Sequence, residues 1–155
     1  MVKLGFHVSI AGAFAHAVER AQVLGCDTFQ MFTRSPRIWA AKPIDIAAAD
    51  AFATTLTASG IGPVVDHMPY LPNPAAENPD IYEKSVATLT DELTRCGQLK
   101  IPYLVTHLGH HGPEGHKKGQ EKVIDAIGTA LDNADSDTMI LIENTANEKN
   151  TVGCF

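Results

Sequence analysis

The sequence contains few cysteines, few charged residues and no long apolar run, and each shortage excludes a class of protein. Cysteine occurs three times in 155 residues, at Cys26, Cys96 and Cys154. An odd number without a C-x-x-C spacing argues against a disulfide framework and against a zinc site made of thiolates, and it favours a reducing, cytoplasmic compartment. We find neither a signal segment nor an apolar run of membrane-spanning length, so we expect no membrane association.

Positive charge is also scarce, since 18 acidic residues face 12 Lys and Arg and give a formal net charge of −6. A chain of this charge is unsuited to coating nucleic acid through bulk electrostatics, although a local basic patch remains compatible with DNA binding. With 45% hydrophobic and 19% charged residues spread evenly, the sequence predicts a single domain, 1–155, with a real core.

Short apolar runs alternate with helical patterns along the chain. We expect five strands, at 3–9, 26–32, 62–67, 102–108 and 138–144. We expect four helices, at 12–24, 45–58, 80–99 and 117–134. Strict alternation of strand and helix predicts an α/β fold with a parallel sheet and right-handed crossovers.

The lengths of the connections indicate a particular α/β architecture. Helix-to-strand connections are short, as at Gly25 and Ser59-Gly60, whereas strand-to-helix loops are long and rich in Pro, Arg, Tyr and His. Function is therefore expected at the carboxyl ends of the strands, the face that holds active sites in (β/α)8 TIM barrels. A full barrel takes about 250 residues, so this pattern predicts the N-terminal part of a barrel with an open sheet.

Three residues of metal-binding type end three of the expected strands. The central run from Pro102, expected to be a strand buried on both faces, ends at His107, and two other strands end at His67 and Glu143. A buried Glu143 after Ile-Leu-Ile would need a cation or hydrogen-bond donors to offset its desolvation. Together the three predict a zinc site, with manganese as an alternative; taken singly, each histidine is equally well a strand-end residue bonded to a loop.

The other histidines have weaker claims. His7 ends the first expected strand and is a ligand, an outer hydrogen-bond partner of the ligands or a polar core residue. His111, in the loop after the central strand, is also within reach of the site. His16 is expected on the face of a helix, and solvated loop positions are expected for His110 and His116.

Two loops carry side chains suited to DNA. One holds Arg34 and Arg37 beside Trp39, and the other carries Tyr70. An Arg fits a phosphate contact, and an Arg or Tyr fits insertion into a groove; the alternative is a structural Trp39 with its usual neighbours. We find no P-loop, no G-x-S-x-G and no cysteine placed as a nucleophile, which excludes phosphate binding by a glycine loop and serine hydrolysis.

Four blocks of the sequence resemble the endonuclease IV family, in the same order and at similar spacings. They are GFHVSIAG at 5–12, FQMF with PRIW within 29–39, HLGHH at 107–111 and IENTA at 142–146. The resemblance covers the whole chain. It implies a (β/α)8 apurinic/apyrimidinic endonuclease that uses three zinc ions to cleave double-stranded DNA 5′ to an abasic site, a reaction of base excision repair.

By position, this resemblance implies roles for five residues. His67, His107 and Glu143 become zinc ligands, with Glu143 bridging two metal ions at the catalytic centre. Arg37 and Tyr70 become parts of the loops that enter the DNA at the lesion. In that family the zinc ions generate a hydroxide nucleophile and neutralise the phosphate, so no protein nucleophile is required.

The sequence also departs from the family pattern. Leu108 stands where the family usually has proline, and Met68 follows His67, changes that should alter the loops more than the ligands. The chain ends before the family's later Asp, His and Glu ligands, so we expect a partial metal site, little endonuclease activity and self-association through open sheet edges. Two alternatives stay open: a sugar isomerase or epimerase of the related xylose-isomerase-like barrels, and a non-catalytic fragment.

Overall fold

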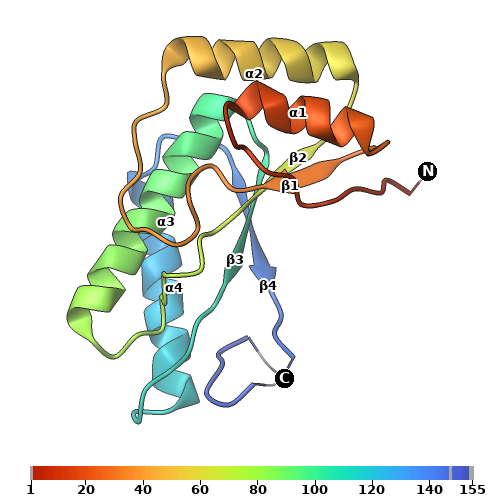
Figure 1. Cartoon of the computed structure of the whole chain (residues 1–155). Helices are drawn as coiled ribbons and strands as arrows, with labels where there is room; N and C mark the ends of the chain where they lie inside the picture. Colours follow the sequence, from red (N-terminus) through yellow and green to blue (C-terminus); the bar gives the residue numbers. More distant parts are fainter. Residues whose placement is uncertain (1, 147, 154–155) are drawn as a thin grey trace.

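The sheet consists of parallel strands that follow the order of the chain (Figure 1). The computed structural model describes residues 2–146 and 148–153, with strands β1 (Phe29–Met31), β2 (Val64–His67), β3 (Tyr103–His107) and β4 (Met139–Glu143). Its helices are α1 (Phe14–Val23), α2 (Ile46–Ser59), α3 (Pro79–Leu99) and α4 (His116–Asn133). Because the strand order never reverses, every crossover runs in the same direction and the helices stay on one side of the sheet. The predicted partial α/β barrel is confirmed.

The prediction of a fifth strand, at 3–9, is wrong within the described residues. This segment runs beside β1, where Val8 N donates to Gln30 O at 2.8 Å and Gln30 N donates to Phe6 O at 3.1 Å. The two segments nevertheless share a single isolated bridge. Leu4 remains 70% exposed and Phe6 62%. Val8 is buried in the main core, but Leu4 and Phe6 lack the packing that stabilises a regular strand.

Local capping signals set the helix ends close to the predicted bounds. The Asp45 side chain accepts from Ala47 N at 2.8 Å at the start of α2, and Gly60 ends that helix with a left-handed φ of 69°. Asn78 caps α3 by accepting from Ile81 N. The helices begin and end within two residues of the predicted ranges. In the described part of the chain, no helix combines the length and apolarity needed to cross a membrane.

The two faces of the sheet differ in burial. Side chains that point toward the helices are buried and form the main core, among them Phe29, Met31, Val64 and Leu104. The alternate positions of β3 are only partly buried. The prediction that this strand is buried on both faces is therefore wrong, because the helices cover one face only. The face of the sheet opposite the helices, here called the inner face, remains accessible to a ligand.

A buried ionic network joins the loop after β1 to α3. Arg34 Nε donates to the Glu92 carboxylate, which also accepts from the Thr33 hydroxyl. Arg34 Nη2 pairs with Asp91, and Arg95 Nε donates to Thr33 Oγ1 at 2.9 Å. Glu92 is fully buried, and both guanidinium side chains are nearly so. Two positive and two negative groups therefore balance on the helix side of the sheet.

Asp66, on β2, places a third carboxyl group next to this network. Its full burial, and then the charge of Glu92, raise the pKa of Asp66 well above the usual carboxyl value. The Cys96 thiol donates to Asp66 Oδ2 at 3.3 Å, and burial raises the pKa of that thiol as well. Both shifts favour the neutral form of the group over its charged form, as burial in an apolar core does.

Replacing Glu92 tests how much the network stabilises the fold. In Glu92→Gln, Arg34 and Arg95 lose their buried counter-charge, and we expect the free energy of unfolding to fall by about 3–5 kcal/mol. Asp91→Asn is the matched control, because Asp91 pairs with the same guanidinium but its side chain is 50% exposed; its loss should stay below about 1 kcal/mol. Urea unfolding followed by circular dichroism measures both values. Equal losses would contradict a stabilising role for the buried network.

For the isolated 155-residue chain, the edges of the described sheet predict self-association. Leu4 is exposed beside β1, and β4 pairs only with β3 among the described strands and leaves Ile142 58% exposed. Unpaired backbone groups beside apolar side chains favour edge-to-edge pairing. We expect dimers or larger species by sedimentation velocity, at a lower population in Ile142→Lys than in the control Val23→Lys, which changes an exposed site on α1. A wild type that stays monomeric at every concentration would contradict this.

Candidate metal centre

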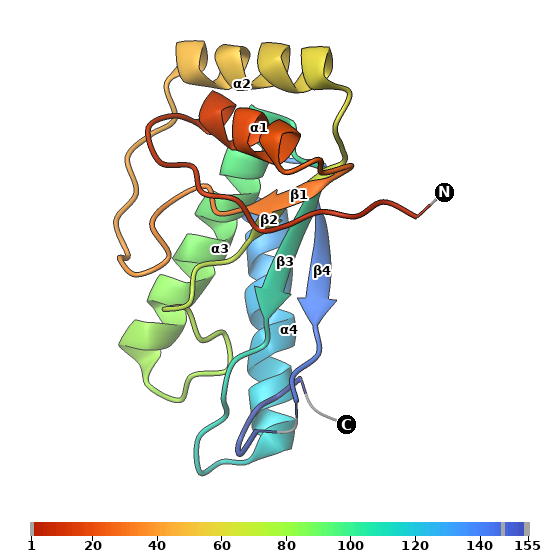
Figure 2. The ribbon, with the colours of Figure 1, turned by 45° about the vertical axis from the view of Figure 1, so that its right-hand side comes forward.

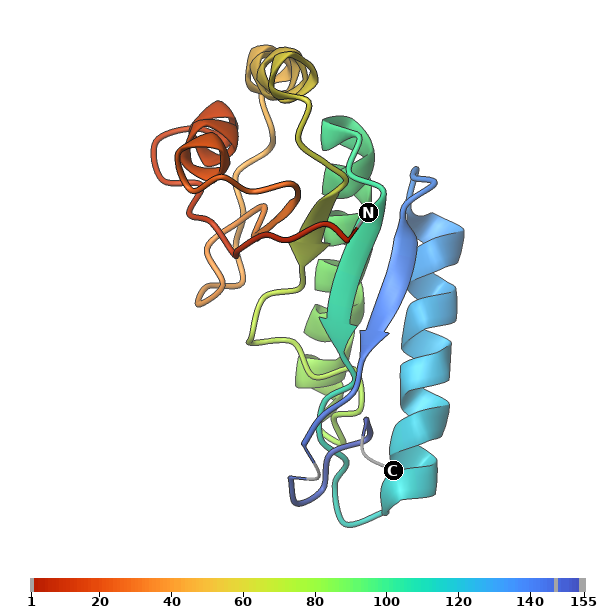
Figure 3. The same cartoon turned by 90° about the vertical axis from the view of Figure 1, so that its right-hand side faces the viewer.

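The backbone register places three side chains on the inner face, at the carboxyl end of the sheet. His107 pairs with Glu143 across β3 and β4, and His67 pairs with Val105, two residues before His107. Residues two apart on a strand point to the same face. His67, His107 and Glu143 therefore share one face. Figure 2 and Figure 3 show β3 and β4 ending at the same edge, beside the turn that follows β4.

Within the described residues, these three side chains form the one group with metal-ligand geometry. Glu143 Oε2 lies 3.0 Å from His67 Nε2 and 3.8 Å from His107 Nε2. One ligand atom from each residue lies within 4.8 Å of the other two. The centroids of the imidazole rings are 5.1 Å apart. An ion that forms bonds of about 2 Å to each donor fits between atoms at such distances.

His67 is oriented as a metal ligand would be. Its Nδ1 lies 2.7 Å from the backbone oxygen of Met68, which can only accept, so Nδ1 is the donor there, and in a neutral ring Nε2 carries the lone pair. That lone pair faces the Glu143 carboxylate at 3.0 Å. Two acceptors at this distance repel each other unless a cation or a proton lies between them. The donor set therefore fits a divalent cation such as zinc.

Glu143 is more exposed than predicted. Its side chain is 40% accessible, so the prediction of a buried carboxylate is wrong. Glu143 ends β4, an edge strand of the described sheet, and neighbouring Ile142 and Met139 are exposed as well. The facing imidazoles, rather than desolvation of the carboxylate, are what favour a cation here.

His7 and Phe32 lie next to the ligand group. His7 Nδ1 is 2.9 Å from Gln30 Oε1, and the His7 ring centroid is 4.4 Å from Phe32 and 6.5 Å from His67. Phe32 in turn meets the His67 ring edge-on at 5.7 Å. His7 thus stands outside the three ligands but close to them, and its role as an outer partner stays a prediction.

The histidines that follow β3 lie outside the ligand group. The His111 ring packs against His116 at 6.0 Å, and its Nδ1 lies 2.8 Å from the backbone oxygen of Gly112. The prediction that His116 is a solvated loop residue is wrong, because it begins α4 and its Nε2 lies 3.2 Å from Val152 O. His110 is exposed, as predicted, and has Nε2 3.9 Å from a Glu148 oxygen.

Tyr70 lies beside both histidines of the group. Its ring centroid is 6.1 Å from that of His67 and 6.4 Å from that of His107, and the residue is 63% exposed. The backbone N of Tyr70 donates to Pro36 O at 3.2 Å, which joins its loop to the loop of Arg37. Arg37 is exposed, whereas the neighbouring Arg34 belongs to the buried ionic network.

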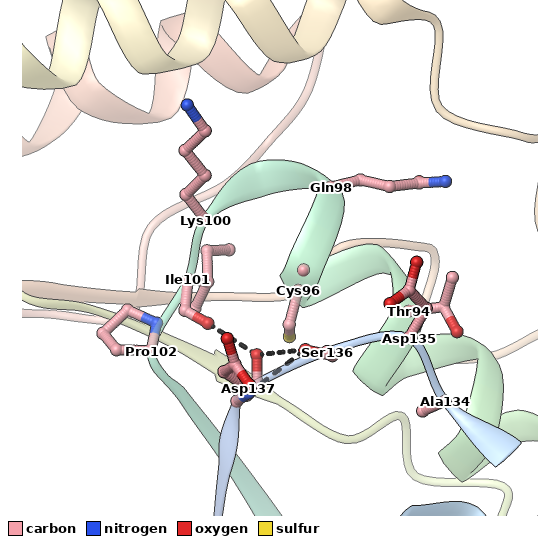
Figure 4. Close-up of a pocket in the computed structure, with 12 residues that line it drawn as sticks. Thr94, Cys96, Gln98, Lys100, Ile101, Pro102, Ala134, Asp135, Ser136 and Asp137 are labelled. Atoms are coloured by element: carbon pink, nitrogen blue, oxygen red, sulfur yellow. Dashed lines mark hydrogen bonds between the residues drawn. The ribbon is translucent and has the colours of Figure 1, made fainter.

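Two cavities differ in chemical character. The first, of about 640 Å³, opens beside the ligand group and is lined by residues that include Tyr70, Asn73, His107, His110, Glu143 and Glu148. The second, of about 800 Å³, lies at the opposite end of the strands, around the end of α3 and the turn before β4 (Figure 4). There the Thr138 hydroxyl donates to Ile101 O at 2.8 Å and accepts from Ser136 Oγ at 2.7 Å. These bonds join the turn before β4 to the segment before β3, and the second cavity lies away from the three ligand-type residues.

Two residues at the site were missed by sequence reasoning. Phe32 packs edge-on against both the His67 ring, at 5.7 Å, and the Tyr70 ring, at 5.4 Å. A signal for it existed, because Phe32 ends a predicted strand at the same edge as His67. Asn73 bonds to the backbone of His110. Nothing local distinguishes Asn73, which lies in a Pro-rich loop far from His110 in sequence.

Comparison with known proteins identifies a family. The family model described as xylose isomerase-like TIM barrel matches residues 18–155. The sequence is 74% identical over 154 residues to the probable endonuclease 4 of Methanocorpusculum labreanum and 60% identical over 154 residues to that of Methanoculleus marisnigri. Both alignments cover 99% of this chain and 55% of the relative. The chain therefore spans about half the length of the curated relatives it matches.

Solved structures agree with the sequence matches. Endonuclease IV from Thermus thermophilus superposes with a TM-score of 0.85 at 40% identity, over 98% of this chain and 55% of that one. A D-psicose 3-epimerase superposes with a TM-score of 0.68 at 13% identity, over 96% of this chain and 55% of that one, which is a likeness of fold alone. The chain belongs to the xylose isomerase-like TIM barrel family and, within it, is similar to the endonuclease IV proteins.

Proposed function

We propose that this chain is part of a zinc-dependent DNA-repair endonuclease that cleaves double-stranded DNA 5′ to abasic sites. The observation that carries the proposal is the position of an exposed aromatic ring, Tyr70, directly beside the group formed by His67, His107 and Glu143. The similarity to proteins named endonuclease 4 supports it. Relatives are longer than this chain, so the activity is proposed for a protein of which this chain forms one part.

The ligand group supplies the proposed metal chemistry. His67 and His107 would hold zinc through Nε2, and Glu143, which lies against both, would be the shared carboxylate and the catalytic residue. Zinc bound there would lower the pKa of water and neutralise charge on a phosphate. Three zinc ions are proposed for the complete site, and manganese also fits a donor set of imidazole and carboxylate. The bond from His67 Nδ1 to Met68 keeps the ring in one orientation before any ion binds.

The two neighbouring loops supply the proposed lesion contacts. Arg37 is exposed and positively charged, which suits a backbone phosphate. Tyr70 offers an exposed ring that can stack on a base or fill the space of a missing one. The hydrogen bond between Tyr70 N and Pro36 O keeps the two loops together. Affinity would then depend on both phosphate charge and the absence of a base.

A sugar isomerase or epimerase is the second candidate. Its support is the likeness of fold to sugar epimerases, at 13% identity for the D-psicose 3-epimerase. The exposed pair Arg37 and Tyr70 favours DNA over a small sugar, because both side chains lie outside the ligand group on adjoining loops. Turnover of a ketose by the zinc-loaded chain, without any preference for abasic DNA, would favour the sugar enzyme instead.

Removing one ligand tests the metal assignment. We expect wild type to retain zinc after dialysis and His107→Ala to bind it at least about tenfold more weakly, because no neighbouring side chain replaces the lost imidazole. His16→Ala, which removes an exposed histidine of α1, should leave zinc binding unchanged. Elemental analysis and titration with a zinc indicator measure content and affinity. Equal zinc content in wild type and His107→Ala would refute the site.

Removing the lesion contacts tests the substrate. In a gel-shift titration with zinc, wild type should bind an abasic duplex more tightly than the intact duplex. Arg37→Ala and Tyr70→Ala should keep their zinc yet lose about tenfold or more of this preference, the effect of one lost stacking or charged contact. Lys42→Ala removes the same charge from another exposed position and should retain the preference. Unchanged preference in both variants would rule out their role in recognition.

A further inference from the structure

One side chain ties the loop of Tyr70 to the loop that follows His107. Asn73 Oδ1 accepts from His110 N at 3.0 Å, and Asn73 Nδ2 donates to His110 O at 3.0 Å. The amide group thus satisfies both backbone groups of one residue, as a neighbouring strand would. Asn73 Oδ1 also accepts from Ala75 N at 3.1 Å, which fixes the side chain to its own loop.

We infer that Asn73 is a positioning residue that sets the place of the Tyr70 ring relative to His107 and the metal ligands. The inference rests on the proposed function, in which Tyr70 contacts the lesion while His107 holds the metal. Asn73 acts through the backbone of the two loops that carry these residues.

The loop after His107 is built to receive this side chain. Gly109 has a left-handed φ of 77°, and a Cβ at that position would lie 2.0 Å from Asn73 Oδ1. Only glycine accommodates both the backbone conformation and the close approach. From the other side, Ser85 Oγ accepts from Asn73 N at 2.8 Å, and Ser85 is buried on α3. The bond to Ser85 therefore fixes the backbone of Asn73, and the Asn73 side chain extends from this fixed point to the backbone of His110.

The receiving loop is itself held in place. Val152 N donates to Gly109 O at 3.0 Å, and His111 N donates to Asn150 O at 2.8 Å. A second apolar cluster lies beneath the loop and contains Ala75, Val123 and Val152, with Leu108 packed against it. The hydrogen bonds from Val152 and His111 hold the receiving loop without any contribution from the Asn73 side chain, so it offers Asn73 a fixed partner.

The distance from Asn73 to Tyr70 is short along the chain. Leu71 and Pro72 alone separate them, and the proline ring restricts the backbone between them. A shift at Asn73 is therefore passed on to the Tyr70 ring, whose centroid lies 6.4 Å from that of His107. Tyr70 N also donates to Pro36 O, so the segment 70–73 is held by hydrogen bonds at both of its ends.

The positional part of the inference is tested by NMR of ring-labelled tyrosine. The chain has three tyrosines, and Tyr103 lies on β3, whereas Tyr82, on α3, is linked to the Asn73 loop through Lys122, which bonds to Ala76 O. In Asn73→Ala, we expect the Tyr70 ring signals to move toward those of a free tyrosine while the Tyr103 signals, as the internal reference, stay unchanged. A general loss of folding would move all three. Unchanged Tyr70 signals would overturn the inference.

Two further variants sharpen this test. Asn73→Asp keeps the oxygen that accepts from His110 N but loses the donor to His110 O, so we expect a smaller shift of the Tyr70 signals than in Asn73→Ala. Asn133→Ala removes a side-chain hydrogen bond of similar type at the end of α4, to Thr129 O, and should leave Tyr70 unchanged. An Asn133→Ala shift as large as that of Asn73→Ala would overturn the inference.

The functional part of the inference is tested by measuring binding to abasic DNA. Asn73→Ala should keep its zinc and lose about tenfold of the preference for abasic over intact duplex. Combined with Tyr70→Ala, it should cause no further loss, because both changes remove the same contact. Additive losses would overturn the role through Tyr70. If wild type itself shows no preference for abasic DNA, the proposed function fails, and the Tyr70 ring signals still decide whether Asn73 positions that ring.

Discussion

The candidate site depends on the hydrogen-bond register of three parallel strands. His107 is paired with Glu143, and His67 is paired with Val105. A slip of one residue in either pairing would turn one of the three side chains to the helix side, where Asp66 and Thr106 are buried. The metal-type ligands meet because the main chain aligns the carboxyl ends of their strands, and no sequence motif joins them.

That register is supported from the helix side. The apolar core and the buried pairing of Glu92 with Arg34 connect α3 to the loop that follows β1. Asp66, adjacent to His67, faces this core, so one face of β2 is anchored while the other is free to present an imidazole. One face of the sheet thus packs against the helices and stabilises the fold, and the other face remains open to a ligand.

The loops at the carboxyl end add a second layer of order. Tyr70 gains its place beside His67 and His107 through backbone contacts to Pro36 and through the side chain of Asn73. The proposed lesion contacts and the proposed metal ligands therefore belong to one connected framework. Such a framework would hold an aromatic ring at a set distance from a metal ion without a direct bond between them.

Local signals in the sequence determined the alternation of strands and helices, the helix ends and the three strand-end residues of the candidate site. Caps such as Asp45 and Asn78 act within one turn, and parallel strands bring their carboxyl ends together, so both kinds of inference need only nearby residues or a general rule. Four outcomes needed the tertiary structure: the irregular segment at 3–9, the exposure of Glu143, the bonded position of His116 and the contact of Asn73 with His110. Each depends on which distant segment packs against the residue, and burial and hydrogen bonding between distant segments leave no local pattern in the sequence.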